Sequence, residues 1–342
     1  MRSASLEGSF HGVLACTERL LILRSAEGLV VADTARLVEL WRRPLSNVTP
    51  VALRGEDVVL GEGSELVLLH GQTGQELVRR RMRGPTYELV ADLDRGVVLA
   101  GANDERLWLL VGVDFGADFG RELWRVRHAQ SPPEPASLYG ILGDVVLIRR
   151  PLGALRTDDG QPDEQGAQLA RRLDYHGELG DGPRRHEACL GGWGVAVATD
   201  PSVSRTVYDH DALEVTSPDG QRRRVELPVL RAASAPQAAL HRMNWSVSIA
   251  ESLGYLVSTA NPMLGAAPPG TDVLSVDWNV VNVICVDLAR AAICLNVGFP
   301  VDLQGEFQTI EGIALDDAFL VAIATPGACT LVRLEGSPSV RQ

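Results

Sequence analysis

Short runs of aliphatic residues, each beginning next to a turn-forming or polar residue, recur seven times along the chain. Each run is about five residues long, which suits a buried strand and is too short for a helix of ordinary length. The sequence therefore predicts seven similar units with one buried strand each. The runs are residues 19–23, 57–61, 96–100, 144–148, 194–198, 254–258 and 318–322.

A second element follows the first three runs and reads Glu39-Leu40-Trp41, Glu76-Leu77-Val78 and Glu122-Leu123-Trp124. Each copy comes after a further strand and a turn, so that one unit reads strand, strand, strand, turn, strand. In the second unit we expect strands at 51–53, 58–60, 66–69 and 76–81. Four short antiparallel strands in about 40 residues have the dimensions of a propeller blade.

The order of an apolar strand, a turn such as Gln72-Thr73-Gly74 and then Glu-Leu-Trp resembles the repeat of the PQQ-like and WD40-like β-propellers. The resemblance runs from about residue 10 to residue 335. The seven units and the resemblance together predict an all-β protein, a seven-bladed β-propeller of four-stranded antiparallel blades in a single domain over residues 1–342, with less than a tenth of the residues in helices. Trp41 and Trp124 are expected to pack between neighbouring blades. The expected blades are roughly 10–45, 46–84, 85–130, 131–180, 181–230, 231–300 and 301–342.

The two ends of the chain are expected to close the ring. The last unit offers only three strands, at 308–314, 319–324 and 330–334. A closed ring leaves no blade edge unsealed, so a fourth strand must come from elsewhere. Residues 3–10 and 337–341 are both candidates, and the N-terminal segment is the favoured one, because the first unit already has four strands between Gly12 and Arg43.

Composition excludes several classes of ligand and of catalytic mechanism. The 342 residues carry 44 acidic and 32 basic residues, a net charge of −12, which argues against binding nucleic acid or an anionic membrane surface. All 32 basic residues are arginine, which excludes mechanisms that need a catalytic lysine. With neither an export signal nor a membrane-spanning segment recognisable, we expect a cytoplasmic protein. The five cysteines never occur as C-x-x-C, and we expect buried free thiols.

Function is expected where the loops are long. The spacing of the runs grows towards the C-terminus, which predicts a loop-rich face over blades four to six. The acidic stretch 158–164 could hold calcium, but it lacks the alternating ligands of a dedicated site, and a solvated loop is the favoured interpretation. The long loops are expected at 151–166, 175–185, 200–211 and 262–277.

Three histidines, His11, His186 and His241, each stand just before an expected innermost strand, at positions that ring the central funnel of a propeller. They could hold a divalent metal ion, the one cofactor that the pattern suggests, or they could form structural hydrogen bonds within their blades. If the protein is an enzyme, the candidate catalytic residues are His11, His186, His241, Glu88, Glu134 and Glu306.

Two functions from different classes follow. The first is a protein-interaction scaffold that binds partners through its loop-rich face, with arginine clusters such as 79–83 available to an acidic partner surface. The second is a lyase, cyclase or hydrolase, metal-dependent or not, with its active site in the funnel. A protein partner or a small molecule at the funnel face is therefore expected. The scaffold is favoured, since no motif demands chemistry.

Overall fold

The computed structural model describes the chain in segments, and its contacts divide the chain into two compact units. One comprises Val13–Asp181, and the other, which we call the terminal unit, comprises Met1–Gly12 with Gly182–Gln342. The described residues are 1–46, 49–92, 94–101, 107–129, 137–142, 144–150, 153–175, 187–190, 193–198, 212–228, 230–231, 239–250, 252–262, 280–300, 309–315, 318–325 and 327–335.

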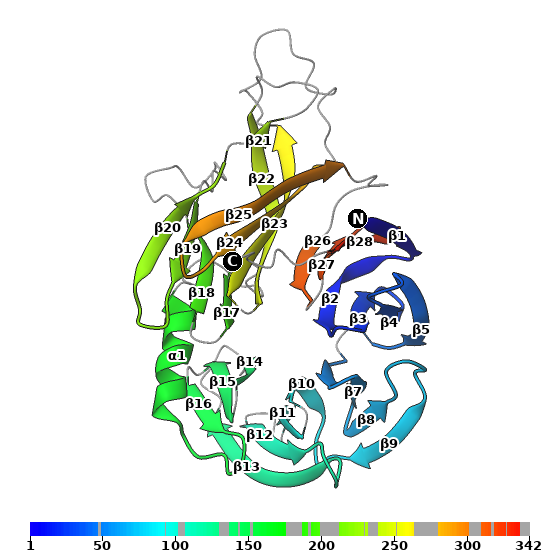
Figure 1. The fold of residues 1–342 in the computed structure, drawn as a ribbon. Helices are drawn as coiled ribbons and strands as arrows, with labels where there is room; N and C mark the ends of the chain where they lie inside the picture. The colour runs from blue at the N-terminus through cyan, green and yellow to red at the C-terminus, as the bar shows by residue number, and fades with distance from the viewer. Residues whose placement is uncertain are drawn as a thin grey trace. The chain divides into compact units, whose positions relative to one another are not determined.

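The Val13–Asp181 unit, with the first residues of β2 added, holds four antiparallel sheets in which strands that follow one another in the chain are neighbours (Figure 1). Its strands are β2 (Phe10–Cys16), β3 (Leu20–Ser25), β4 (Gly28–Asp33) and β5 (Val38–Pro44); β6 (Val51–Arg54), β7 (Asp57–Glu62), β8 (Glu65–Leu69) and β9 (Glu76–Arg81); β10 (Thr86–Ala91), β11 (Arg95–Gly101), β12 (Leu107–Asp114) and β13 (Arg121–Ala129); and β14 (Ser137–Leu142), β15 (Val145–Arg150) and β16 (Gly153–Arg156).

The terminal unit holds three more sheets, with the orders β17-β18-β19-β20, β21-β22-β23-β24-β25 and β1-β28-β27-β26. Its strands are β1 (Arg2–Glu7), β17 (Glu187–Leu190), β18 (Trp193–Ala198), β19 (Ala212–Thr216), β20 (Arg222–Glu226), β21 (Leu230–Arg231), β22 (Ala239–Ala250), β23 (Leu253–Pro262), β24 (Val280–Asp287), β25 (Ala292–Pro300), β26 (Thr309–Ala314), β27 (Ala318–Ala324) and β28 (Ala328–Glu335).

The all-β prediction and the consecutive antiparallel strands are confirmed, and the seven aliphatic runs lie in seven different sheets. The prediction of four strands in every sheet is wrong for two of them. Among the described residues, the sheet of β14 has three strands, and the sheet of β22 has five because β21 pairs with β22. Closure of the sheets into one seven-bladed ring stays a prediction.

The aliphatic runs are continuous because their strands are buried on both faces. Val58 and Leu60 of β7 pack against Leu20 and Ile22 of β3. Val59, between them, belongs to a core shared with β11 and β12 on the opposite face. A strand covered on both sides needs apolar residues at every position, not at alternate ones.

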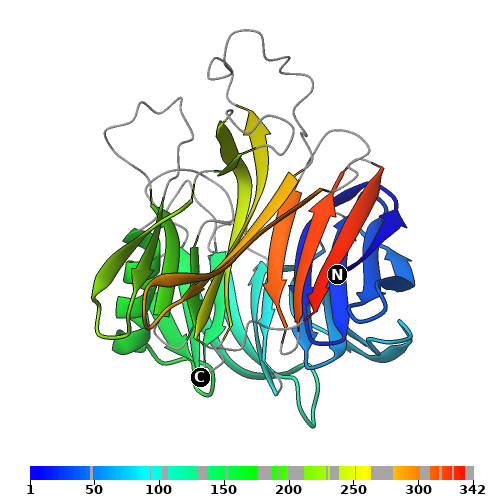
Figure 2. The ribbon, with the colours of Figure 1, turned by 45° about the horizontal axis from the view of Figure 1, so that its top comes forward.

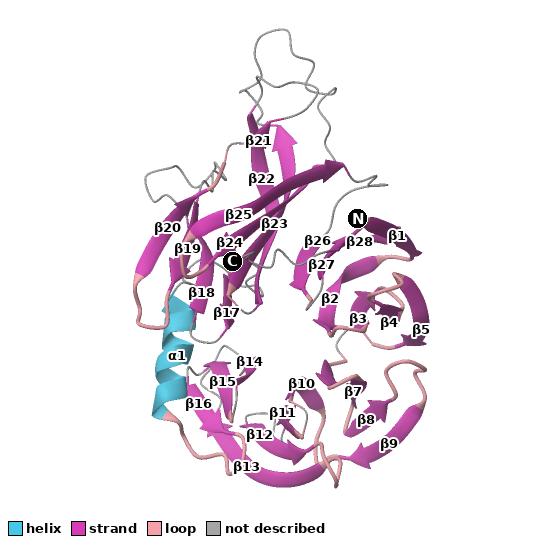
Figure 3. Ribbon diagram, viewed as in Figure 1, coloured by secondary structure: helices cyan, strands magenta, loops and turns pink. Residues whose placement is uncertain are grey.

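One helix lies among the described residues, within the small helical share that the sequence predicts, although no pattern in the sequence located it. Helix α1 (Glu164–Tyr175) packs against β15 and β16 (Figure 3). The side-chain carboxylate of Asp163 accepts the backbone N–H of Gly166 at 2.6 Å and caps the helix. Ala167 and Ala170 are buried against the sheet. Residues 151–166 are therefore not one long loop, since they contain β16, a turn and the start of α1. No helix among the described residues is long and apolar enough to cross a membrane.

The N-terminal strand completes the last sheet, as the sequence predicts. Strand β1 pairs antiparallel with β28 from Arg2 opposite Arg333 to Glu7 opposite Ala328 (Figure 2). At the end of this pairing the guanidinium of Arg2 is hydrogen-bonded to the carboxylate of Glu335. The Nε–H of Arg333 donates to the same carboxylate at 3.3 Å. The carboxylate of Glu335 is thus hydrogen-bonded to two arginines at the end of the strand pair.

Outer strands are joined to the following sheet by one repeated contact. The indole N–H of Trp41 on β5 donates to the carbonyl of Gly71, after β8, at 2.6 Å. The indole N–H of Trp124 on β13 donates to the carbonyl of Thr157, after β16, at 2.8 Å. The expectation that both tryptophans pack between neighbouring sheets is therefore confirmed.

The turn that receives each tryptophan contains a glycine with positive φ. Gly74 has φ +69°, and a Cβ there would lie 2.8 Å from the ring of Trp41. Gly160 has φ +69°, and a Cβ there would lie 2.6 Å from the ring of Trp124. Glycine is required at both positions for its left-handed conformation and for the absence of a side chain under the ring.

Replacement of Gly74 by alanine tests this contact. Gly63 is the matched control, because its φ is +60° and no atom lies within 4 Å of a Cβ placed there. We expect Gly63→Ala to lower the free energy of unfolding by about 1 kcal/mol through backbone strain alone. Gly74→Ala should lower it by a further 1–3 kcal/mol or so, because the methyl group displaces the indole. Urea unfolding measures both, and equal losses would contradict the contact.

The Arg2–Glu335 pair predicts a dependence of stability on pH. The hydrogen bond that Arg2 donates to Glu335 holds the pKa of Glu335 below its ordinary value of 4.5. A carboxyl with a lowered folded-state pKa stabilises the fold above its unfolded-state pKa, and this contribution disappears as the pH falls through the folded-state pKa. Glu335→Gln should therefore lower the melting temperature at pH 7 and have no effect near pH 2. Glu226→Gln, which removes the partner of exposed Arg224, is the control and should show little change at either pH.

Candidate functional site

Strand β9 is the described strand most exposed along its whole length, since all six of its side chains are exposed. It is the last strand of its sheet, so one edge carries backbone groups with no strand partner among the described residues. Leu77 and Val78 are 46% and 40% exposed, although aliphatic. An edge strand that presents apolar side chains is a surface that another strand can join.

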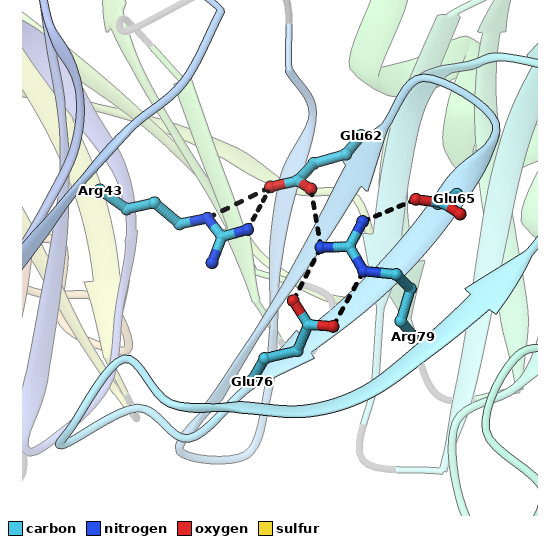
Figure 4. Close-up of polar contacts among 5 residues, drawn as sticks. All are labelled: Arg43, Glu62, Glu65, Glu76 and Arg79. Carbon is cyan, nitrogen blue, oxygen red and sulfur yellow. Dashed lines mark hydrogen bonds and ion pairs between the residues drawn. The ribbon is translucent and has the colours of Figure 1, made fainter.

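A network of five charged side chains holds β9 on one side (Figure 4). Arg79 pairs with Glu65 at 2.6 Å, with Glu76 at 2.7 Å and with Glu62 at 3.2 Å. Arg43, on β5 of the preceding sheet, pairs with the other oxygen of Glu62 at 2.7 Å. The network therefore links β5 to the sheet of β9 through Glu62.

The hydrogen bond between Arg79 and Glu76 stabilises the charges of both groups. This bond is the largest cause that raises the pKa of Arg79, and it lowers the pKa of Glu76. Both groups are therefore charged near neutral pH, and their pairing positions β9.

Arg80 holds β9 on the other side. Its aliphatic stem lies over Gly120, which has φ +81°, and a Cβ there would be 2.5 Å from Arg80 Cγ. Its guanidinium lies 3.7 Å from the carboxylate of Asp118 in the same turn. Arg80 thus covers the turn glycine as Trp41 and Trp124 do, from two residues beyond Val78, which stands at the tryptophan position. Both neighbouring sheets therefore contact β9.

Two further arginines extend the positive charge of this strand. Arg81 ends β9 and Arg83 follows it, and both are exposed. Neither forms an ion pair with another residue in the described part of the chain. The exposed surface made by Leu77, Val78, Arg81 and Arg83, which we call the β9 surface, is therefore apolar at one end and positively charged at the other.

The predicted funnel residues are only partly placed by the structure. His11 lies on β2 and His241 on β22, so both are within the first long strand of their sheets and not before it. The side chain of His11 is exposed. His186, Glu134 and Glu306, together with the side chain of His241, lie outside the described residues. No cluster of three metal-binding side chains occurs in the described segments. The three-histidine metal site stays a prediction.

Glu88 has a structural contact that the sequence did not indicate. Its carboxylate on β10 accepts the backbone N–H of Leu138, on β14 of the next sheet, at 2.6 Å. The acidic stretch 158–164 is also committed to local structure. Asp159 pairs with Arg156 and accepts the backbone N–H of Gln161 at 3.0 Å, while Asp163 caps α1. These contacts favour the solvated-turn interpretation over a calcium site.

Comparisons with known proteins identify no family for this sequence. No protein-family model matches it. No curated protein matches it either. BamB from Moraxella catarrhalis is structurally similar, with 14% identity over 98% of both chains and a TM-score of 0.48. Kluyveromyces lactis Hsv2 has 10% identity over 91% of this chain and 90% of its own, with a TM-score of 0.46.

A third similar structure is the β-propeller domain of Cps50 (Swd1) from Myceliophteria thermophila, with 12% identity, a TM-score of 0.43, and coverage of 96% of this chain and 97% of that one. At such identities and TM-scores these likenesses say nothing about the partner or the activity of this chain.

The role of Glu88 can be tested by two substitutions. Glu88→Ala should lower the free energy of unfolding by about 1–3 kcal/mol, because the N–H of Leu138 loses its acceptor. Glu88→Gln keeps an acceptor oxygen and should cost clearly less. Chemical denaturation of both variants measures the difference. If the two substitutions were equally harmless to stability, the backbone contact would not be the role of Glu88.

Proposed function

We propose that this protein is an interaction scaffold, and that the β9 surface binds an extended, acidic segment of a partner protein. The observation that carries the proposal is the edge strand β9, which is held by Arg79 and Arg80 yet leaves Leu77 and Val78 exposed. An incoming strand could pair with the free edge, place apolar side chains against Leu77 and Val78, and place acidic ones near Arg81 and Arg83.

Charge complementarity selects the partner. The chain has a net charge of −12, so an acidic segment would be repelled by most of its surface. Arg81 at the end of β9 and Arg83 beyond it, which form no ion pair with another described residue, provide a local exception. Binding there would therefore be specific in position and would weaken as salt screens the attraction.

We further propose that the seven sheets are the blades of one closed seven-bladed propeller in the cytoplasm. The pairing of β1 with β28 supports closure, because it joins the first residues of the chain to its last sheet. The loop-rich face over blades four to six is a second proposed binding surface. Its loops at 175–185, 200–211 and 262–277 lie outside the described residues except for their end residues Tyr175 and Pro262.

A short peptide of alternating glutamate and valine, of about eight residues to match a strand, is the probe for the β9 surface. Fluorescence anisotropy should show that Leu77→Asp weakens its binding about tenfold or more, which corresponds to about 1.4 kcal/mol. Arg81→Glu should weaken binding and reduce its dependence on salt. Because Leu77 is exposed, its substitution should leave the melting temperature nearly unchanged.

Leu123→Asp is the matched control, since Glu122-Leu123-Trp124 repeats Glu76-Leu77-Val78 and Leu123 is 38% exposed on β13. It should leave peptide binding intact. A peptide with lysine in place of glutamate should not bind. Equal losses from Leu77→Asp and Leu123→Asp, or equal binding of the basic peptide, would contradict the β9 surface as the site.

A further inference from the structure

Two cysteines of the terminal unit lie side by side on neighbouring strands. Cys285 is on β24 and Cys294 is on β25, and these strands pair antiparallel in the five-stranded sheet. The expectation of buried thiols holds for Cys285 and Cys329, whereas Cys16 is half-buried and Cys294 is exposed. Cys294 is therefore the accessible member of a pair whose other member is enclosed.

A β-bulge brings the two thiols together. Cys285 pairs with Leu295 and the next residue, Val286, pairs with Ile293, so Cys294 is the extra residue of the bulge. Both Cys294 and Leu295 then lie opposite Cys285. The thiol of Cys294 donates to the backbone carbonyl of Cys285 at 3.4 Å. Opposite residues of antiparallel strands have Cα atoms about 4.5–5.5 Å apart, within the range that a disulfide spans.

The surroundings of the two sulfurs give them different roles. Cys285 belongs to the core between this sheet and the sheet of β27, together with Tyr255 and Phe319. Burial raises the pKa of the Cys285 thiol, and the neighbouring Cys294 thiol raises it further. A reagent from solution therefore meets Cys294 first, and Cys285 can react only with a sulfur already held beside it.

We propose that Cys285 and Cys294 form a reversible cross-strand disulfide, with a low-molecular-weight disulfide such as glutathione disulfide as the oxidant. The thiolate of Cys294 attacks one glutathione sulfur, and the first glutathione leaves as a thiolate, which takes up the proton released by Cys294. The Cys285 thiol then loses its proton and attacks the Cys294 sulfur of the mixed disulfide. The second glutathione leaves and takes up that proton. Two protein thiols are oxidised and one glutathione disulfide is reduced to two thiols.

The bond would change the edge of the sheet. Strand β25 is the last strand of its sheet in the described part of the chain, and hydrogen bonds to β24 hold it there. A disulfide at the bulge would add a covalent link near the turn end of the pair, where Asp287 pairs with Ala292, and would close a short ring through the turn at Leu288–Ala291. The part of β25 next to the turn would then be unable to separate from β24 until a thiol reductant cleaved the bond.

The experiment uses the wild-type chain, because no substitution is needed to detect the bond. The reduced protein is incubated with glutathione disulfide and its free thiols are counted after denaturation, when the number should fall from the five cysteines of the sequence to three. Cleavage after Arg290 then separates the two cysteines, so a disulfide between them joins two peptides that dithiothreitol releases. A link from Cys285 to Cys329, distinguished by fragmentation of the joined peptides, would overturn the proposal.

Substitutions provide the controls. Cys294→Ser should abolish the link, and Cys285→Ser should stop the reaction at a stable mixed disulfide on Cys294. Cys329→Ser, which removes a buried thiol on β28, should leave the link intact. If the wild-type protein accumulated only the mixed disulfide, or kept all its thiols, the proposal would be wrong.

Discussion

Two outer strands of this protein are joined to the sheet that follows them by a tryptophan. The indole lies over a turn of the next sheet and donates a hydrogen bond to a backbone carbonyl there. Trp41 over Gly74 is the clearest case. The contact requires a particular residue type at two positions. The strand needs a large side chain that can donate a hydrogen bond, and the turn beneath it needs glycine.

Arginine makes one part of this contact in each of two other sheets. The aliphatic stem of Arg80 lies over Gly120, and Arg223 on β20 donates to the carbonyl of Ala289, in the turn before β25, at 3.0 Å. A guanidinium has several donors in a plane and an apolar stem, so it can cover a turn and bond to it together. A lysine has only a compact ammonium group at its tip. In the sheet of β20, which lacks the Glu-Leu-Trp element, an arginine thus provides the hydrogen bond to the following sheet.

The sequence predicts what depends on periodicity and misses what depends on single contacts. The strands of the second unit, β6 to β9, begin and end within about two residues of the predicted positions, because each is a short apolar or charged run between turns. The position of helix α1 was not predicted, although Asp163 before Glu164 is a recognisable capping residue; its described buried residues Ala167 and Ala170 leave little hydrophobic signal. The bulge at Cys294 had no signal at all, since a bulge is a property of the strand pair.

Strand β9 shows how one strand can serve both the fold and a partner. The side chains of Arg79 and Arg80 form ion pairs with residues of the fold. Leu77 and Val78, in the same strand, are exposed and contribute little to the core. A strand held in this way has little conformational entropy left to lose, so the ordering cost of binding falls mainly on the incoming segment. Substitutions at the two arginines would disturb fold and binding together. Substitutions at the two aliphatic residues act on the exposed face alone, and this separation allows an interaction surface to change while the sheet that carries it remains intact.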